Sequence, residues 1–246
     1  MNELRLGIRA RNLHKKLGPN QALAGLSMNF SAGLMHGLIG PEGAGKTTLL
    51  RSILGLLKPN QGELIYESDG KSVSLESIRD TIAYMPQQQS LYADLSIGEH
   101  LDFFRELYQI PSNEYAEKRK HLLHITRLAN FIDRPAGKLS GGMYKKLGLM
   151  CALLRSPQAM LLDEPTNGVD PISRREFWDL LYELQRHDIL IIIATAYMDE
   201  AERCGQVHLI EAGRCLAEGD PHAILNNEGV NNFDAFFIKR GTEALR

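Results

Sequence analysis

The sequence predicts an α/β fold in which a parallel sheet, covered by helices, is interrupted by a long helical segment. Four short apolar runs without alternation support the sheet, because such runs are typical of strands buried on both faces. These runs are residues 34–39, 82–85, 159–162 and 189–193. Between about residues 90 and 157 the strand pattern disappears and helical periodicity replaces it.

The order of these segments predicts a single domain, residues 1–246, with an inserted helical part. We expect an α/β core at about residues 1–89 and 158–225, a helical subdomain at about 90–157, and a tail at 226–246. A chain of 246 residues can form a substantial core without a disulfide or metal. The three cysteines show no paired spacing, so we expect them to be reduced and mostly buried.

Local signals place the helices of the first two thirds of the chain. Residues 46–57 carry apolar side chains at helical spacing. Ser96 and Glu99 form a capping-box pattern at the start of a helix expected at 96–108. A second helix of the inserted part is expected at about 113–129.

The last third of the chain predicts a further helix, a hairpin and a tail. Apolar periodicity indicates a helix at 144–154. Residues 207–210 and 214–217 flank Glu-Ala-Gly and predict a hairpin. The Asn-rich residues 226–232 are expected to form a loop before a short terminal helix.

Charge and hydropathy restrict the class of partner. The 28 basic and 30 acidic residues give a net charge of −2, so the basic footprint of a nucleic-acid-binding protein is missing and we expect no nucleic-acid partner. The longest apolar stretch, residues 189–196, is too short to cross a bilayer, and the first residues lack the apolar region of a signal peptide. We therefore expect a cytoplasmic chain unless a partner carries it to a membrane.

Residues 40–47, Gly-Pro-Glu-Gly-Ala-Gly-Lys-Thr, match the Walker A phosphate-binding pattern in full, between a predicted strand and a predicted helix. The glycines let backbone N–H groups turn onto the phosphates, Lys46 reaches the β and γ phosphates, and the Thr47 hydroxyl binds Mg²⁺. The sequence therefore predicts a P-loop core that binds ATP and Mg²⁺. The ATP-binding residues predicted here are Gly40, Pro41, Glu42, Gly43, Ala44, Gly45, Lys46, Thr47 and Thr48.

Two carboxylates, Asp163 and Glu164, follow the apolar run at 159–162 and so stand at the tip of a buried strand. Asp163 is suited to hold Mg²⁺ through water, and Glu164 to orient and activate the attacking water. An acidic pair alone is as typical of a surface turn. Beside a Walker A motif it indicates a Walker B motif followed by a catalytic glutamate.

Residues 139–143, Leu-Ser-Gly-Gly-Met, precede the predicted helix at 144–154. The Ser140 hydroxyl, the glycine amides and the helix dipole would form a second phosphate-binding surface, although an ordinary helix cap has the same pattern. A P-loop protein needs a second phosphate cradle only where two chains share each nucleotide. That consideration favours a phosphate-binding role.

Together these motifs resemble the nucleotide-binding domain of the ATP-binding cassette (ABC) superfamily. The resemblance covers nearly the whole chain and includes a Q-loop at 84–87 and a D-loop at 168–170. It implies a P-loop NTPase (RecA-like) core with an antiparallel β portion and a helical subdomain between Walker A and the signature motif. It also implies a head-to-tail dimer that holds two ATP molecules between the Walker A of one cassette and the signature of the other.

The resemblance also assigns site residues and partners. Gln87 would be a catalytic residue and a metal ligand, beside Thr47 and Asp163 as metal ligands. The residues expected to contact the nucleotide across the dimer are Ser140, Gly141, Gly142 and Asp170. The motifs are most similar to those of multidrug-type and polysaccharide-type exporters, particularly drug-efflux ATPases with two cassettes in one chain. This implies a transmembrane permease, a second cassette as homodimer or tandem partner, and a place on the cytoplasmic face of the membrane.

Three positions depart from the family pattern. Leu17 stands where the family usually has an aromatic residue stacked on adenine, so we expect weaker nucleotide binding. Met143 replaces the usual glutamine of the signature, where Ser140 and the glycines are kept. Ala196 stands where the family has its switch histidine, which contacts the γ phosphate. We therefore hypothesise that the chain hydrolyses ATP slowly or acts mainly as an ATP-dependent clamp.

Two classes of function fit these motifs. The first is an ATPase subunit or cassette half that powers a membrane exporter. The second is a soluble cassette protein acting on ribosomes, DNA or cluster assembly, or an ATP-regulated interaction module with little turnover. The near-neutral charge, the single cassette and the lack of a charged linker or coiled-coil insertion favour the first. The motifs do not identify the transported substance, because in this family the membrane partner selects it.

Overall fold

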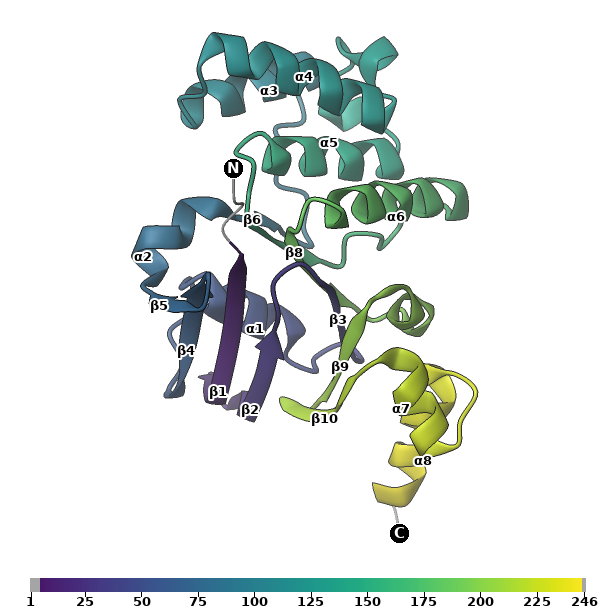
Figure 1. Cartoon of the computed structure of the whole chain (residues 1–246). Coiled ribbons are helices and arrows are strands. Elements are labelled where there is room, and N and C mark those ends of the chain that lie inside the picture. Colours follow the sequence, from purple (N-terminus) through teal and green to yellow (C-terminus); the bar gives the residue numbers. More distant parts are fainter. Residues whose placement is uncertain (1–4, 245–246) are drawn as a thin grey trace.

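Two sheets, with helices between and around them, make up residues 5–244, the part of the chain that the computed structural model describes (Figure 1). Six strands form one sheet in the order β10-β9-β3-β8-β7-β6, and four form another in the order β2-β1-β4-β5. The larger sheet contains β3 (Met35–Ile39), β6 (Ile82–Met85), β7 (Ala159–Asp163), β8 (Leu190–Thr195), β9 (Gln206–Glu211) and β10 (Arg214–Gly219). The smaller sheet contains β1 (Leu6–Leu17), β2 (Asn20–Phe30), β4 (Gln61–Ser68) and β5 (Lys71–Val73).

The larger sheet is parallel from β6 to β9, and only β10 runs antiparallel to its neighbour. Every residue of β3, β7 and β8 is buried, which confirms three of the four apolar runs as strands covered on both faces, whereas β6 is an edge strand whose first three residues are half-buried. Because β8 lies between β3 and β7, the ends of these strands meet at one edge. Ile39 pairs with Thr195, and Asp163 pairs with Ala194.

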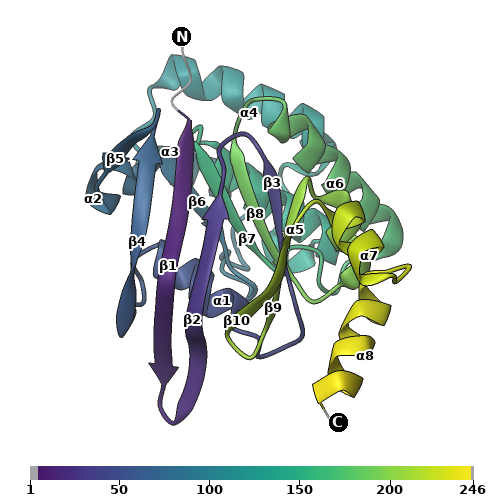
Figure 2. The same ribbon diagram turned by 60° about the horizontal axis from the view of Figure 1, so that its bottom comes forward.

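The smaller sheet supplies the antiparallel portion that the resemblance implied. β1 and β2 form a long hairpin whose register shifts at several points, so the strands bend as they cross the molecule. Their buried side chains, Leu13 and Leu23 among them, share a core with Leu50 of α1 (Lys46–Ile53) and Leu161 of β7. The helix that begins at the P-loop therefore lies between the two sheets (Figure 2).

Helices cover the opposite face of the larger sheet. Four of them stack over it in Figure 1: α3 (Ile97–Leu107), α4 (Ser112–Thr126), α5 (Gly141–Leu153) and α6 (Pro171–Gln185). The other helices are α2 (Leu75–Ile78), α7 (Pro221–Glu228), α8 (Phe233–Ala244) and the 3-10 turns η1 (Arg79–Thr81), η2 (Ala129–Phe131), η3 (Ala136–Lys138) and η4 (Met198–Arg203). Within residues 5–244, no helix combines the length and the apolar character needed to span a membrane.

The capping box at the start of α3 and the hairpin of β9 and β10 are confirmed. Ser96 Oγ accepts a bond from the Glu99 N–H at 3.2 Å, and the Glu99 carboxylate accepts one from the Ser96 N–H at 2.7 Å. The hairpin pairs Arg214 with Glu211. Both features depend on neighbours in the sequence, which is why local patterns located them.

Several predicted boundaries were wrong. α1 ends at Ile53 rather than at residue 57, since Gly55 turns the chain with a φ of 70°. The helix expected to reach residue 129 ends at Thr126, because the next residue is left-handed. The loop expected from residue 226 begins later, since α7 continues to Glu228 and closes at the left-handed Gly229.

Candidate nucleotide-binding site

The loop between β3 and α1 has the shape that a phosphate cradle requires. Gly45 has a φ of 108°, and a Cβ there would lie 2.4 Å from the carbonyl oxygen of Ala22. A Cβ on Gly40 would lie 2.0 Å from the carbonyl oxygen of Ile210. The first N–H groups of α1 have no acceptor within their own helix, so they point away from its N-terminus, which carries the partial positive charge of the helix dipole. The glycines therefore fix both the turn and the close packing behind it.

A cleft of about 520 Å³ opens in front of this loop. Ten residues predicted from the sequence line it: Leu17, Glu42, Gly43, Ala44, Gly45, Lys46, Thr47, Thr48, Gln87 and Glu164. Asn20, Gln21 and Ala22 also line it, and these were missed because the β1–β2 hairpin was not located from the sequence. Leu17 is 44% exposed at the mouth of the cleft. The arrangement thus joins the hairpin, the loop and the strand ends around one space.

The Lys46 ammonium lies inside the cleft among oxygen acceptors. It donates to the carbonyl oxygens of Gly40 at 2.6 Å and Pro41 at 3.0 Å. Its Nζ also lies 3.4 Å from Oε1 of Glu164, and both side chains are more than nine-tenths buried. Gly40 and Pro41 do not line the cleft themselves, but their carbonyl oxygens bind Lys46, which does. The Lys46 ammonium is thus held at the cleft by two carbonyl oxygens and one carboxylate.

Asp163 lies behind the cleft, fully buried at the end of β7. Its Oδ1 accepts a bond from the Thr47 hydroxyl at 3.0 Å and its Oδ2 one from the Tyr84 hydroxyl at 3.2 Å. Burial raises the pKa of Asp163, and the bonds from Thr47 and Tyr84 oppose that effect. Two oxygen ligands of the kind that Mg²⁺ prefers are therefore already adjacent.

Tyr84 is a site residue that the sequence argument did not single out for contact with Asp163. Burial and the neighbouring Asp163 raise the pKa of its hydroxyl, so it stays a protonated donor. The available signal was its position: β6 and β7 are adjacent parallel strands, and Tyr84 pairs with Leu161, two residues before Asp163. That register becomes visible only once the strand order is known.

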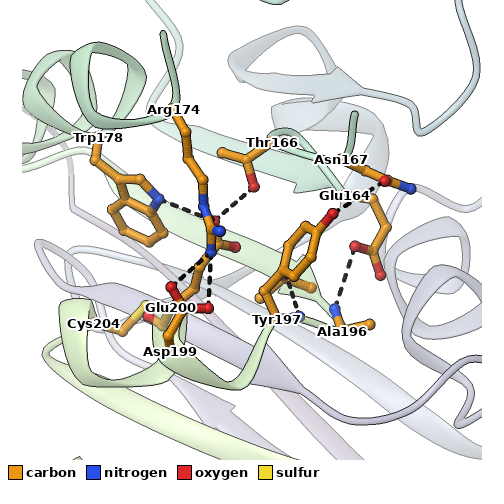
Figure 3. Close-up of polar contacts among 11 residues, drawn as sticks. Glu164, Thr166, Asn167, Arg174, Trp178, Ala196, Tyr197, Asp199, Glu200 and Cys204 are labelled. Atoms are coloured by element: carbon orange, nitrogen blue, oxygen red, sulfur yellow. Dashed lines mark hydrogen bonds and ion pairs between the residues drawn. The ribbon is translucent and has the colours of Figure 1, made fainter. Parts of the chain in front are cut away.

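Glu164 contacts Lys46, Lys145 and Ala196 at the edge of the cleft, and Figure 3 shows the contact with Ala196. Its backbone adopts a left-handed φ of 48°, which is uncommon for a residue with a side chain. Its Oε2 accepts the backbone N–H of Ala196 at 3.2 Å, and its carbonyl oxygen accepts the ammonium of Lys145 at 3.3 Å. Burial raises the pKa of Glu164, whereas the charge of Lys46 and the Ala196 amide lower it.

Ala196 follows directly after β8, and its backbone N–H bonds to Glu164. Its side chain is a methyl group, so its polar contact with the site is the backbone N–H alone. The neighbouring Tyr197 does not reach Glu164 but donates to Asn167 at 3.4 Å. Within residues 5–244, no histidine lines the cleft.

The signature residues lie apart from the cleft. The Ser140 hydroxyl caps α5 by accepting the Met143 N–H at 3.3 Å. Asp170 caps α6 by accepting the N–H groups of Ile172 and Ser173 at 3.1 and 3.0 Å, and these bonds lower its pKa. The described residues that line the cleft include none of the predicted set Ser140, Gly141, Gly142 and Asp170.

The signature and the D-loop do contact each other. A Cβ on Gly142 would lie 2.3 Å from Cβ of Ser173, and a Cβ on Gly141 would lie 3.1 Å from the carbonyl oxygen of Gly168. The start of α5 therefore packs tightly against the start of α6. Within one chain, the P-loop cleft and the predicted phosphate-binding surface at the start of α5 therefore lie apart from each other.

The cysteines and the nearby histidine form no metal site. All three cysteines are free; Cys151 and Cys204 are buried and Cys215 is half-buried. His208 bonds to His36 at 3.0 Å and to Glu218 at 3.1 Å. No cluster suited to hold a metal ion through three His, Cys, Asp or Glu residues occurs between residues 5 and 244.

Comparison with known proteins gives concordant matches. A family model described as "ABC transporter" matches residues 23–167. The probable multidrug ABC transporter ATP-binding protein YbhF of Escherichia coli (strain K12) is 42% identical over 212 residues, covering 86% of this chain and 37% of that protein. The Nod factor export ATP-binding protein I of Burkholderia lata is 37% identical over 219 residues, covering 89% of this chain and 72% of that protein.

Solved structures give the same picture. One described as "Structure of ATP binding subunit of ABC transporter" superposes with a TM-score of 0.81 and 27% sequence identity, covering 94% of this chain and 98% of that one. The predicted mixed α/β P-loop fold and the motif resemblance are therefore confirmed. The chain spans only 37% of the length of YbhF.

Proposed function

The chain belongs to the ABC transporter family, and on that premise we propose that it is an ATP-binding subunit, or one cassette half, that powers a membrane exporter. The names of two relatives, one a multidrug transporter protein and one a Nod factor export protein, support an export role. The observation that carries the proposal is the cleft, where Lys46, the Thr47–Asp163 pair and Glu164 converge. Multidrug-type efflux is the transport that we infer.

The residues of the cleft fit ATP with Mg²⁺. The Lys46 ammonium and the first N–H groups of α1 would hold the phosphates, and Leu17 would cover one face of the adenine. Thr47 and Asp163 supply hard oxygen ligands, and Gln87 lines the same cleft. Bound Mg²⁺ would offset the negative charge of the phosphates.

We assign proton acceptance from the attacking water to Glu164, with Gln87 helping to hold that water. The family implies ATP hydrolysis as its activity. In this chain, however, Ala196 has no side-chain donor for the γ phosphate, and its amide already binds Glu164. Donors aimed at the developing charge supply much of the rate in such reactions, so hydrolysis here should be slow.

A second cassette would complete the site. Ser140, Gly141, Gly142 and Asp170 stand apart from the cleft of their own chain, which supports their use on the nucleotide of a partner. Binding of ATP between two such surfaces would draw the cassettes together. The partner is a second copy or the other half of a tandem chain, as the length of YbhF suggests for that relative.

A permease is the proposed membrane partner, with the cassette at the cytoplasmic face. A groove is lined by Met85 and Pro86, which precede Gln87, and by Phe104 of α3 and Tyr108, which directly follows α3. Large apolar side chains nearby, such as Tyr92, are exposed. Apolar exposure beside a groove suits an amphipathic segment of a membrane protein.

The experiment is purification of the tagged chain from its native membranes in mild detergent. The proposal expects an integral membrane protein in about equal amount, with stimulation of ATP hydrolysis in the complex. Recovery in the soluble fraction with ribosomes at moderate salt would support the soluble alternative instead. A chain that remains free of both, with no effect of membranes on hydrolysis, would contradict the exporter assignment.

A further inference from the structure

The five residues after β8 are tied to Thr166, Asn167 and α6 by polar contacts that the proposed hydrolysis does not use (Figure 3). Arg174, in the first turn of α6, makes most of them. Its Nε donates to Glu200 at 2.9 Å, and its Nη2 donates to both carboxylate oxygens of Asp199 at 2.9 and 3.0 Å. Its guanidinium also lies 4.5 Å from the centre of the Tyr197 ring.

Glu200 anchors this cluster in the core. Its side chain is fully buried, and its Oε1 accepts three bonds: from the Thr166 hydroxyl at 2.6 Å, from Arg174 and from Trp178 Nε1 at 3.1 Å. Its Oε2 has no partner among the described residues. A buried carboxylate with one ion-pair partner depends strongly on that partner, so Arg174 and Glu200 should keep a fixed geometry.

The anchoring extends along the backbone to Ala196. Tyr197 is held by its hydroxyl on Asn167, by its N–H on Thr195 Oγ1 at 3.0 Å and by its ring against Arg174. Ala196, between Thr195 and Tyr197, has its N–H directed at Glu164 Oε2. Residue 196 is alanine and not histidine, so its side chain makes no polar contact with Glu164. Residues 196–200 therefore act on the Glu164 carboxylate through the Ala196 N–H.

We propose that Arg174 is a positioning residue for Glu164. By holding Tyr197, Asp199 and Glu200 at once, it fixes the backbone at Ala196, and the Ala196 amide fixes the carboxylate that faces the attacking water. Arg174 lies in α6, and its backbone N–H bonds to the carbonyl oxygen of Asp170 at 2.8 Å, so its contacts also link the orientation of Glu164 to the D-loop and α6. The inference rests on the hydrolysis part of the proposed function and is independent of the membrane partner.

Arg174→Lys is the test variant. Lysine keeps the positive charge opposite buried Glu200 but lacks the planar fork that reaches Glu200 and Asp199 together. The matched control is Arg175→Lys, one residue along α6, whose exposed side chain makes no polar contact within residues 5–244. If Arg174→Lys does not fold, Asp199→Asn is the second test variant. It weakens the exposed contact of Arg174 with residue 199 and leaves the buried contact between Arg174 and Glu200 in place.

Two measurements read the variants: amide hydrogen exchange, and single-turnover hydrolysis of Mg·ATP with separately measured ATP affinity. In Arg174→Lys, the peptide containing Ala196 should exchange roughly tenfold faster while the β7 peptide is unchanged, because only the local contacts are released. The hydrolysis rate should fall about fivefold while ATP affinity stays within about twofold, since loss of one carboxylate bond affects the base rather than the phosphates. Asp199→Asn should change both in the same direction, and Arg175→Lys neither.

Unchanged exchange at Ala196 in Arg174→Lys would overturn the proposal. So would equal acceleration of exchange in β7 together with a parallel loss of ATP affinity, because those changes indicate a general structural role. A wild-type chain without measurable hydrolysis would contradict the ATPase assignment, and exchange at Ala196 would still decide the role of Arg174.

Discussion

The two sides of the cleft differ in how completely they are equipped. On the P-loop side, Lys46, Thr47 and the first turn of α1 present side-chain and backbone donors together. On the opposite side, Glu164 faces a residue, Ala196, that offers only a backbone N–H. In the proposed function, the P-loop side holds the phosphates, and the Ala196 side offers no side-chain donor to the transition state.

Under the proposed function, this difference predicts that nucleotide binding and hydrolysis can be separated within one cassette. Binding uses groups that are present before and after the reaction, and we place these groups on the P-loop side. The hydrolysis rate depends on groups that act on charge as it develops, and we place these near Glu164 and Ala196. Substitutions on the two sides should therefore move different quantities.

Glu164→Gln should have the largest effect. Glutamine keeps the shape and can still accept the Ala196 N–H, but it cannot take a proton, so hydrolysis should fall by about 10²–10⁴-fold. ATP affinity should be unchanged or higher, because a negative charge near the phosphates is removed. Single-turnover hydrolysis and equilibrium ATP binding check both values; an equal loss of the two would place Glu164 in binding instead.

Lys46→Ala should mainly affect the P-loop side. Removal of a buried ammonium aimed at the phosphates should weaken ATP binding about a hundredfold, as expected for charge-assisted bonds worth about 2–3 kcal/mol. Titration with a fluorescent ATP analogue measures this. Retention of wild-type affinity would contradict the placement of the phosphates, and Lys145→Ala, on the Glu164 side, serves as the comparison.

Ala196→His should supply the side-chain donor that residue 196 lacks. An imidazole at the end of β8 can contact the γ phosphate, so hydrolysis should rise about tenfold with ATP affinity changed by less than about threefold. Steady-state phosphate release with both proteins at saturating ATP is the measurement. Ala196→Gln, which adds bulk and a different donor, tests whether the gain requires the imidazole.

Leu17→Tyr should have the smallest effect. An aromatic ring at the mouth of the cleft can stack on adenine, which should tighten ATP binding about fivefold, for a gain near 1 kcal/mol. Hydrolysis at saturating ATP should not change. Titration of Leu17→Tyr with ATP and with GTP measures the affinities. An equal gain in affinity for both nucleotides would still indicate stacking on the base. No gain in affinity for ATP would show that residue 17 does not contact the adenine.

The sequence located features that depend on near neighbours. The runs that became β3, β7 and β8 were identified because burial on both faces leaves a continuous apolar pattern. The P-loop and the Asp163–Glu164 pair were identified because chemistry fixes their spacing. Each of these signals is contained within a few consecutive residues.

Features that depend on packing between distant segments were not located. The Tyr84 contact with Asp163 needs the register of β6 on β7, and the Lys145 contact with Glu164 needs α5 placed over the strand ends. The three donors of Glu200 come from two segments, the turn at Thr166 and the helix α6, which carries Arg174 and Trp178. The end of α1 was misplaced for a local reason, because Gly55 turns the chain there with a φ of 70°. In the other cases the deciding contact is long-range.

One measurement on the wild-type chain bears most closely on the contrast between the two sides: ATP affinity and the single-turnover rate of Mg·ATP hydrolysis in the same preparation, beside a cassette that has the switch histidine. We expect ATP to bind and to be hydrolysed at least about tenfold more slowly than in the histidine-containing cassette, because one transition-state donor is missing. An equal rate would contradict the account, because it would show that Ala196 does not limit hydrolysis.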